Sequence, residues 1–224
     1  MPLNTKVSFH PSHDCQLCPR MVEYRAENRS KSPAAWNAPV SAWGSMDAEL
    51  LIVGLAPEVD GANRTGRPFT GDYAGKLLYE TLMETGFASG IYEASSSDSL
   101  QLHNCRVMHA VHCAPVGDLP LPDEVTTCNT FLKSELQTMP RLKTVLALGV
   151  LAHNAILSAC GIPLSRIHFR HGHSTELPDG LILTDSYHLS RQNINSGILT
   201  KKMFHNIIHS IDHQKPEIEI NIFS

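Results

Sequence analysis

The sequence predicts an α/β fold in which a parallel sheet carries helices on both faces. Two continuous apolar runs, at residues 49–53 and 144–149, are typical of strands that are buried on both sides. Segments with helical spacing follow them, at 76–84 and 150–160, so strand and helix signals alternate along the chain. Such alternation is typical of parallel strands joined by helical crossovers, and the sequence shows no internal repeat that would indicate another architecture.

Each element has its own local signal. A first helix is expected at 18–28, with Pro19 in its first turn, where a missing amide hydrogen does no harm. Asp123 and Glu124 stand in the first turn of a helix at 122–136, where the helix dipole favours acidic side chains. A hairpin around residues 178–180 leads into the last strand. The strands are expected at 49–54, 105–113, 144–149 and 181–188, and the remaining helices at 76–84, 150–160 and 200–212.

Length and composition favour a single domain and a cytoplasmic location. A chain of 224 residues with 42% hydrophobic content can bury a sizeable core. We expect a mobile amino terminus at 1–14, a single domain at 15–212 and a tail at 213–224. The formal charge of -4 means that a nucleic-acid surface has to be local. The amino terminus lacks the apolar core of an export signal, and the longest apolar run, 145–152, is too short to span a bilayer, so we expect a cytoplasmic protein.

A long loop at 54–75 follows the first strand. In open α/β sheets, ligands bind at the carboxyl ends of the strands, where this loop lies. Glycines and prolines fix its shape, and loops of this length inside a compact domain are usually functional. Its candidate functional side chains are Asn63, Arg64, Arg67, Phe69 and Asp72.

The cysteines indicate a metal site. Cys15 and Cys18 form a C-x-x-C pair, and Cys113 and Cys128 flank a proline-containing connector. Without an export signal, disulfides are improbable, and four thiolates suit either zinc or a four-iron cluster. The alternative is that Cys113 and Cys128 are ordinary core residues.

Three separated segments carry a family resemblance. They are Gly-Leu-Ala-Pro at 54–57 with Ala-Asn-Arg-Thr-Gly-Arg-Pro-Phe-Thr-Gly-Asp at 62–72, Ala-Val-His-Cys-Ala-Pro at 110–115, and Ser-Tyr-His-Leu-Ser-Arg-Gln-Asn at 186–193 with Ser-Gly-Ile-Leu-Thr at 196–200. Together they resemble the uracil-DNA glycosylase superfamily, and within it the iron–sulfur family 5 enzymes. The resemblance covers residues 15 to about 208 in the same order.

The resemblance implies a fold, a cofactor and an activity. The fold is a uracil-DNA glycosylase-like three-layer α/β/α arrangement with a four-stranded parallel sheet. A structural [4Fe-4S] cluster would be held by Cys15, Cys18, Cys113 and Cys128. The implied activity is DNA repair, in which the N-glycosidic bond of a flipped-out uracil is hydrolysed. The expected partner is DNA that contains deaminated bases, and we expect a monomer.

The resemblance also implies roles for residues. His188 would donate a hydrogen bond to the pyrimidine O2 as negative charge accumulates there. Asp72 would hold water or offset charge on the sugar, or it would cap the following helix, and Asp60 is a second candidate for the water. The base would meet Gly54, Leu55, Ala56, Phe69 and His109. Phosphates and the vacated base stack would meet Asn63, Arg64, Arg67, Ser190, Arg191, Gln192 and Asn193.

Two departures from the family pattern leave the substrate open. His109 stands where related enzymes commonly place an asparagine, so hypoxanthine or xanthine could be accepted as well as uracil. Leu189 replaces the usual proline after the histidine. One alternative is a catalytically weakened protein of the same fold that binds or traps damaged or single-stranded DNA. A second is a small iron–sulfur electron carrier unconnected with DNA.

Overall fold

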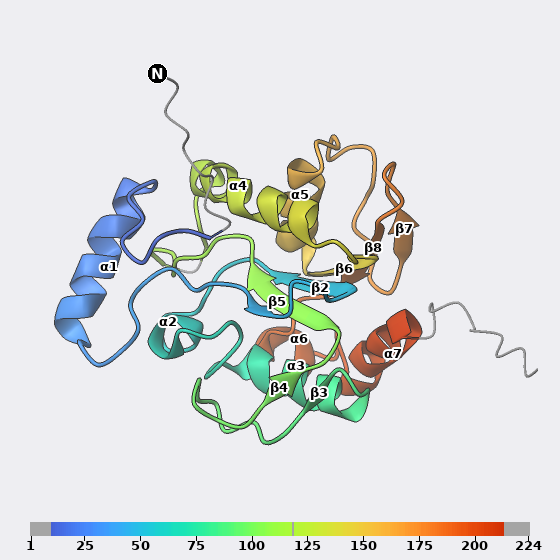
Figure 1. The fold of residues 1–224 in the computed structure, drawn as a ribbon, viewed down its shortest axis with the longest axis horizontal. Coiled ribbons are helices and arrows are strands. Elements are labelled where there is room, and N and C mark those ends of the chain that lie inside the picture. The colour runs from blue at the N-terminus through green and yellow to red at the C-terminus, as the bar shows by residue number, and fades with distance from the viewer. Residues whose placement is uncertain (1–9, 118, 213–224) are drawn as a thin grey trace, which may run out of the picture.

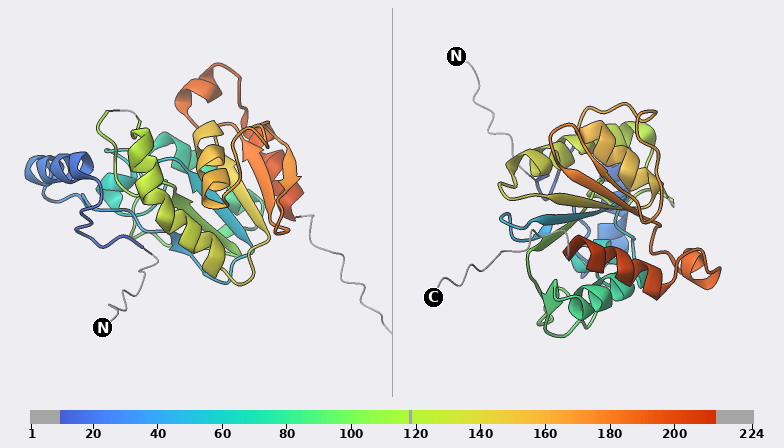
Figure 2. Two further views of the ribbon diagram at one scale, coloured as in Figure 1. Left: turned by 90° about the horizontal axis from the view of Figure 1, so that it is seen from above. Right: turned by 90° about the vertical axis from the view of Figure 1, so that its right-hand side faces the viewer.

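A six-stranded sheet lies between two layers of helices (Figures 1 and 2) in the computed structural model, which describes residues 10–117 and 119–212. The strand order is β1-β5-β2-β6-β8-β7. The four central strands are parallel, namely β5 (Cys105–His109), β2 (Leu50–Gly54), β6 (Thr144–Leu148) and β8 (Ile182–Ser186). The predicted three-layer α/β/α class with four parallel strands is confirmed. Antiparallel strands β1 (Trp43–Gly44) and β7 (Ser174–Glu176) add one short strand at each edge.

The helices follow the expected order with two short additions. The described helices are α1 (Pro19–Lys31), α2 (Ala62–Thr65), α3 (Tyr73–Glu84), α4 (Pro122–Thr138), α5 (Val150–Ala159), α6 (Arg191–Asn195) and α7 (Lys201–Asp212). The short helices α2 and α6 lie inside the two loops that the sequence predicted to be functional. A small separate sheet pairs β3 (Ala88–Ser89) with β4 (Gln101–Leu102).

Alternate side chains of the central strands form two cores, one on each face of the sheet. Leu50 and Ile52 of β2 belong to the core that also contains Phe204 of α7 and residues of α3. Leu51 and Val53 belong to the other core, with residues of α4 and α5. Figure 2 shows α4 and α5 on one side of the sheet and α3 and α7 on the other. Burial on both faces explains why this strand is apolar at every position.

Two predicted strands are shorter than expected. The strand predicted at 105–113 ends at His109, and Val111 beyond it lies in a third cluster with Met21 and Cys128. The strand predicted at 181–188 ends at Ser186, which leaves Tyr187 and His188 at the carboxyl edge of the sheet. The hairpin predicted before it is confirmed, since β7 pairs antiparallel with β8. Both shortened strands end among residues that the sequence assigned to the site.

The chain termini lie outside the part that the structure describes. The predicted tail at 213–224 and most of the predicted mobile segment at 1–14 lie outside the described residues. The single domain at 15–212 stays a prediction. None of the helices within the described residues is both long and apolar enough to pass through a bilayer.

Candidate active site

A cleft of about 420 Å³ opens at the carboxyl edge of the parallel strands. One wall is the loop after β2, another is the connector after β5, and the third is contributed by the turn after β8. This is the edge at which open α/β sheets bind ligands, so topology and geometry agree on the location. The cleft is lined by residues 55–60 together with Pro115, Gly117, Leu119 and His188.

His188 enters the cleft from the turn that follows β8. Burial lowers the pKa of its imidazole, so the ring is neutral at pH 7 and carries one N–H donor. Gly149, at the start of α5, has a φ of 100°, and a Cβ there would lie 3.2 Å from the Cβ of His188. A glycine at this position therefore lets the histidine backbone pass close to the helix.

Phe69 and His109 form a tilted ring pair that does not line the cleft. Their ring centroids are 4.5 Å apart with planes inclined by 31°, and each residue is only 3% exposed. Gly54 lies against this pair, since a Cβ on it would come within 2.5 Å of the Phe69 ring and 3.2 Å of the His109 ring. The predicted base contacts Gly54, Phe69 and His109 are thus brought together, while Leu55 and Ala56 lie at the cleft itself.

His109 carries a buried polar atom without a partner. Burial, with smaller contributions from His112 and His188, lowers the pKa of His109 to about 3, so its ring is neutral. Its Nδ1 makes no hydrogen bond to the described residues. Buried polar atoms are nearly always satisfied, so this nitrogen is available to a ligand group that reaches it. Phe69 above it has a φ of 51°, a strained value for a bulky residue and one that clusters at functional sites.

Asp72 caps helix α3 and keeps one oxygen for other use. Its Oδ1 accepts a hydrogen bond of 2.6 Å from the Gly75 amide, so the capping alternative is confirmed. Its Oδ2 accepts none from the described residues and lies beside Gly61, where a Cβ would approach it to 3.0 Å. Burial raises the pKa of this carboxyl to about 6, and the charge of Glu58 on the cleft wall adds to the rise. Asp60, the second candidate, is exposed and lines the cleft.

Two of the predicted DNA contacts are wrong, because their side chains are interior. Asn63 is 4% exposed, and its amide donates to the Asn37 side chain at 2.9 Å. Arg67 is 5% exposed and forms two hydrogen bonds with the Asp98 carboxylate, of 2.7 and 2.8 Å. The Arg67 guanidinium also lies 4.6 Å from the centroid of the Trp43 ring. Both residues therefore stabilise the loop and cannot reach a phosphate.

The remaining predicted DNA contacts lie at the surface or support it. Arg64, Arg191 and Gln192 are exposed. Ser190 caps α6 by accepting from the Asn193 amide at 3.3 Å, and Asn193 donates from its side chain to the His188 carbonyl at 2.8 Å. The α6 segment thus presents exposed polar side chains next to the histidine that lines the cleft.

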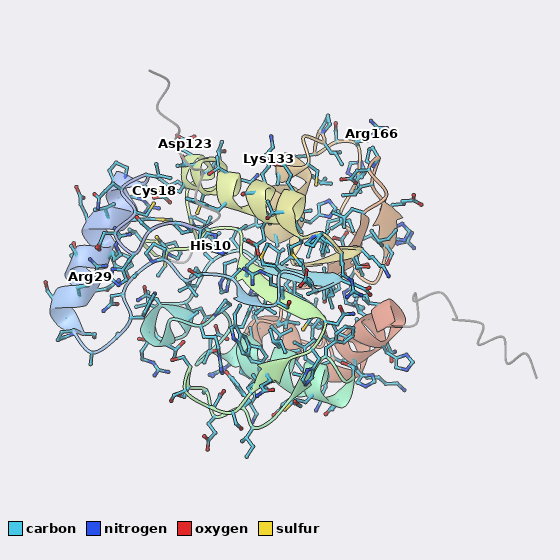
Figure 3. All side chains as sticks on the ribbon, in the orientation of Figure 1. His10, Cys18, Arg29, Asp123, Lys133 and Arg166 are labelled. Atoms are coloured by element: carbon cyan, nitrogen blue, oxygen red, sulfur yellow. The ribbon has the colours of Figure 1, made fainter. Side chains whose placement is uncertain are left out.

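The four predicted metal ligands surround one small cavity of about 20 Å³ between α1, α4 and the connector after β5. Figure 3 labels Cys18, which precedes α1, on the side toward α4. The Arg25 guanidinium approaches the Cys113 sulfur at 3.7 Å, and the His112 amide approaches the Cys128 sulfur at 3.4 Å. Burial raises the pKa of the Cys113 thiol to about 11 and that of Cys128 to about 12. Within the described residues, no three His, Cys, Asp or Glu side chains are arranged as metal ligands.

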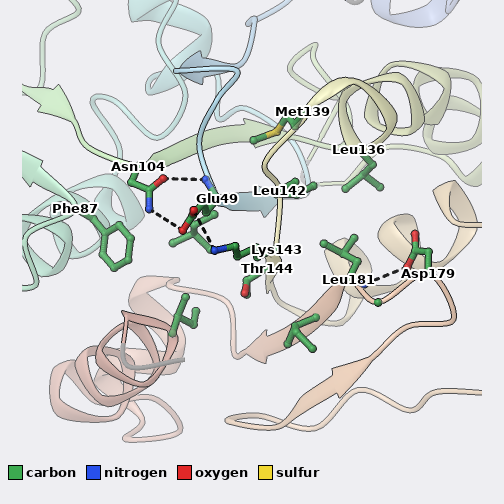
Figure 4. A pocket seen from close by; sticks show the side chains of 14 residues that line it. Glu49, Phe87, Asn104, Leu136, Met139, Leu142, Lys143, Thr144, Asp179 and Leu181 are labelled. Atoms are coloured by element: carbon green, nitrogen blue, oxygen red, sulfur yellow. Dashed lines mark hydrogen bonds and ion pairs between the residues drawn. The ribbon is translucent and has the colours of Figure 1, made fainter. Parts of the chain in front are cut away.

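A second cavity, of about 440 Å³, lies at the opposite edge of the sheet (Figure 4). Its polar side chains satisfy one another, because the Glu49 carboxylate meets Lys143 at 3.1 Å and Asn104 at 3.3 Å. The amino ends of parallel strands are not where such folds bind ligands. The cleft beside His188 is therefore the better candidate for chemistry.

The sequence prediction missed the connector after β5 as a wall of the cleft. Pro115, Gly117 and Leu119 line it, and the available signal was their place at the carboxyl end of a parallel strand. It also missed Glu58 as a neighbour of Asp72, since the two residues are separated by a turn and a short helix.

Comparison with known proteins places these features in a family. A family model described as "Uracil DNA glycosylase superfamily" matches residues 42–211. A "Type-5 uracil-DNA glycosylase" of Thermus thermophilus is 42% identical over 195 residues, which is 85% of this chain and 89% of the relative. Proteins of the same name are 37% identical in Mycobacterium leprae, over 92% of this chain and 91% of the relative, and 37% identical in Pyrobaculum aerophilum, over 84% and 83%.

Proposed function

This chain belongs to the uracil-DNA glycosylase superfamily, and from that premise we propose that it excises uracil from DNA by hydrolysing the N-glycosidic bond. The observation that carries the proposal is the cleft at the carboxyl edge of the sheet, with a neutral histidine on its wall. The enzyme is a DNA glycosylase, and the relatives named Type-5 uracil-DNA glycosylase match it over most of its length.

His188 is the proposed electrophile. Cleavage of the bond between the sugar and the base leaves negative charge on the base, and a preorganised donor near O2 stabilises that charge. A neutral imidazole in a partly buried cleft still carries one N–H, which it can donate to the base oxygen. Removing one such donor typically costs about 10²–10³ in rate.

Asp72 is the proposed partner on the sugar side. Its free Oδ2 is the atom that can orient water or offset positive charge on the deoxyribose, while its Oδ1 holds the helix. With a pKa of about 6, the carboxyl is mostly ionised at pH 7 and still close to the range that suits a general base. Asp60 on the cleft wall is the alternative carboxylate.

The range of bases is proposed from His109. Its unpaired Nδ1 and neutral ring can offer either a donor or an acceptor to a base edge, depending on the tautomer. A side-chain amide would fix one donor and one acceptor. We therefore expect hypoxanthine or xanthine to be accepted as well as uracil once Phe69 has moved to admit the base.

The four thiols of Cys15, Cys18, Cys113 and Cys128 are a donor set that suits a [4Fe-4S] cluster, and we propose that they hold one. Four sulfurs from three separate elements border one cavity, and the two N–H groups that point at Cys113 and Cys128 would stabilise thiolates. Buried thiols with raised pKa values stay protonated unless a metal replaces the proton. The cluster would join α1 to α4 and supply no step of the hydrolysis.

The absorption spectrum of freshly purified protein tests the cluster. We expect brown protein with broad visible absorption, and loss of the colour in Cys128→Ser. Cys160→Ser is the matched control, because Cys160 lies apart from the cavity, and its colour should persist. Colourless protein that contains zinc would contradict the assignment.

DNA binding is proposed for the surface beside the cleft. Arg64 and Arg191 would contact phosphates, and Gln192 would enter the space that the flipped base leaves. The monomeric state and the cytoplasmic location remain predictions.

The activity itself is tested with duplexes that contain one uracil, hypoxanthine or xanthine. Purified protein should produce alkali-labile abasic sites with uracil, and the other two bases report the role of His109. If no abasic sites form while the duplex is retarded on a gel, the protein binds damaged DNA without turnover, and the enzymatic proposal is wrong.

A further inference from the structure

The backbone at Tyr187 leaves the sheet just before the proposed catalytic histidine. The last residue of β6, Leu148, pairs with Ser186, and the first residue of β7, Ser174, pairs with Thr184. Neither neighbouring strand extends to Tyr187, so its amide has no strand partner. A partly buried amide in such a place needs a hydrogen-bond partner from elsewhere.

His171 provides that hydrogen bond. Its Nδ1 accepts from the Tyr187 amide at 2.9 Å, and its ring stacks on the Tyr187 ring with centroids 4.3 Å apart and planes inclined by 7°. The Tyr187 carbonyl accepts from the Ser186 hydroxyl at 3.0 Å. Side chains therefore hold both polar backbone groups of Tyr187.

The segment that carries His171 is itself fixed to β8. The buried Asp185 carboxylate accepts from His153 Nδ1 at 2.8 Å and from the Arg170 amide at 3.0 Å. His153 Nε2 faces the Ile167 carbonyl at 3.1 Å, so both ring nitrogens of His153 face acceptor oxygens. Burial lowers the pKa of His153, but the hydrogen bond and negative charge of Asp185, together with the Ile167 carbonyl, raise it by more, so the pKa is raised overall.

The His188 ring has no such support of its own. Its side chain makes no hydrogen bond to the described residues, whereas its carbonyl accepts from the Asn193 side chain at 2.8 Å. The direction of the imidazole therefore depends on the backbone on either side of it. Small displacements of a catalytic group cost large factors in rate.

We propose that His171 is a positioning residue for base excision, which holds the Tyr187 amide and thereby aims the His188 imidazole into the cleft. This inference rests on the proposed role of His188. The Nδ1 acceptor carries the effect, and the stacked ring contributes packing.

Two substitutions separate the acceptor from the ring. His171→Phe keeps a ring against Tyr187 and removes the acceptor, whereas His171→Asn places an amide oxygen near the position of Nδ1. His168→Phe is the matched control, because His168 is exposed on the same segment and touches no part of the cleft. Single-turnover excision of uracil, duplex affinity and thermal midpoint are measured for each protein.

We expect the single-turnover rate of His171→Phe to fall at least tenfold, with duplex affinity within twofold of the wild type. His171→Asn and His168→Phe should stay within threefold of the wild-type rate. Equal rates for His171→Phe and the wild type, or equally slow His171→Asn and His171→Phe at equal thermal midpoints, would overturn the proposal. If His171→Phe does not fold, His171→Ala takes its place in the same comparison.

Hydrogen exchange at the Tyr187 amide keeps the inference testable if uracil is not excised. Protection should be lost in His171→Phe and retained in His171→Asn. Unchanged protection in His171→Phe would refute the hydrogen bond itself. An inactive wild type with the expected protection pattern would instead refute the proposed function.

Discussion

The loop after β2 and the segment after β8 both have polar residues near the cleft. Several of those in the first loop are buried, whereas most of those in the second are exposed. In the first loop, Asn63, Arg67 and Phe69 are buried and bind the loop to the body of the protein. In the second, Arg191 and Gln192 are exposed on the short helix α6. The first loop is a preformed wall of the cleft, and the second is the surface that we propose to contact DNA. A polar residue near a site is therefore not evidence for ligand contact until its own partner is known.

Removing Arg67 tests the interior role of the first loop and should have the largest effect on stability. Arg67→Ala leaves the buried Asp98 carboxylate without its bidentate partner, and breaking a buried pair typically costs about 3–5 kcal/mol. Urea denaturation of Arg67→Ala and of Arg191→Ala measures the contrast. Arg191→Ala should be within about 0.5 kcal/mol of the wild type, as surface substitutions usually are. Equal losses in the two variants would erase the distinction between the loops.

Asp72→Asn separates the two uses of the carboxyl in the first loop. Asparagine caps a helix about as well as aspartate, so the helix is kept while the charge is removed. We expect the excision rate to fall roughly a hundredfold, the lower end for a general base. Full activity in Asp72→Asn would leave Asp72 with the capping role alone and return Asp60 to consideration.

The ionisation of Asp72 predicts opposite pH trends for stability and for excision rate, which test its role independently. Because its pKa is raised to about 6 in the fold, the ionised form is disfavoured, so stability is greatest below about pH 4 and declines as pH rises through 6. At pH 8, Asp72→Asn should therefore be more stable than the wild type, by at most about 3 kcal/mol. The wild-type excision rate should rise between pH 5 and 7 as the carboxylate forms. Thermal melts and rates across this range check both signs, and a rate that falls over this interval would contradict the role.

Removing Arg191 tests the surface role of the second segment and should have the smallest effect. A lost phosphate contact weakens binding about equally for all sequences and reduces the salt slope by about one. The duplex affinity of Arg191→Ala, measured as a function of salt, gives this slope. Arg67→Met is the control, because it removes an arginine whose side chain is interior. An unchanged slope in Arg191→Ala would remove Arg191 from the DNA surface.

The sequence predicted the sheet and the position of the catalytic candidates better than it predicted contacts. The strands at 49–54 and 144–149 are apolar throughout because both faces are covered, and that signal is local. β1, β3 and β4 have two residues each, too few for any periodicity. His188 was singled out by the family resemblance together with its expected place at the end of a strand, and strand ends meet at one edge of a parallel sheet, although β8 ends two residues earlier, at Ser186.

Contacts between distant segments could not be predicted. Arg67 was expected at a phosphate because its partner, Asp98, stands 31 residues away in a loop rich in serine. His171 had no local signal either, since its role depends on the hairpin that returns β8 beside it. The capping alternative for Asp72, in contrast, was predictable from the helix expected shortly after it at 76–84, although α3 begins earlier, at Tyr73.

Single-turnover excision of uracil from a duplex by the wild type and by His188→Ala tests the central claim most directly. We expect abasic sites to form rapidly with the wild type and about 10²–10³ times more slowly with His188→Ala, at equal duplex affinity and thermal stability. Equal rates for the two folded proteins, or no excision by the wild type, would contradict it.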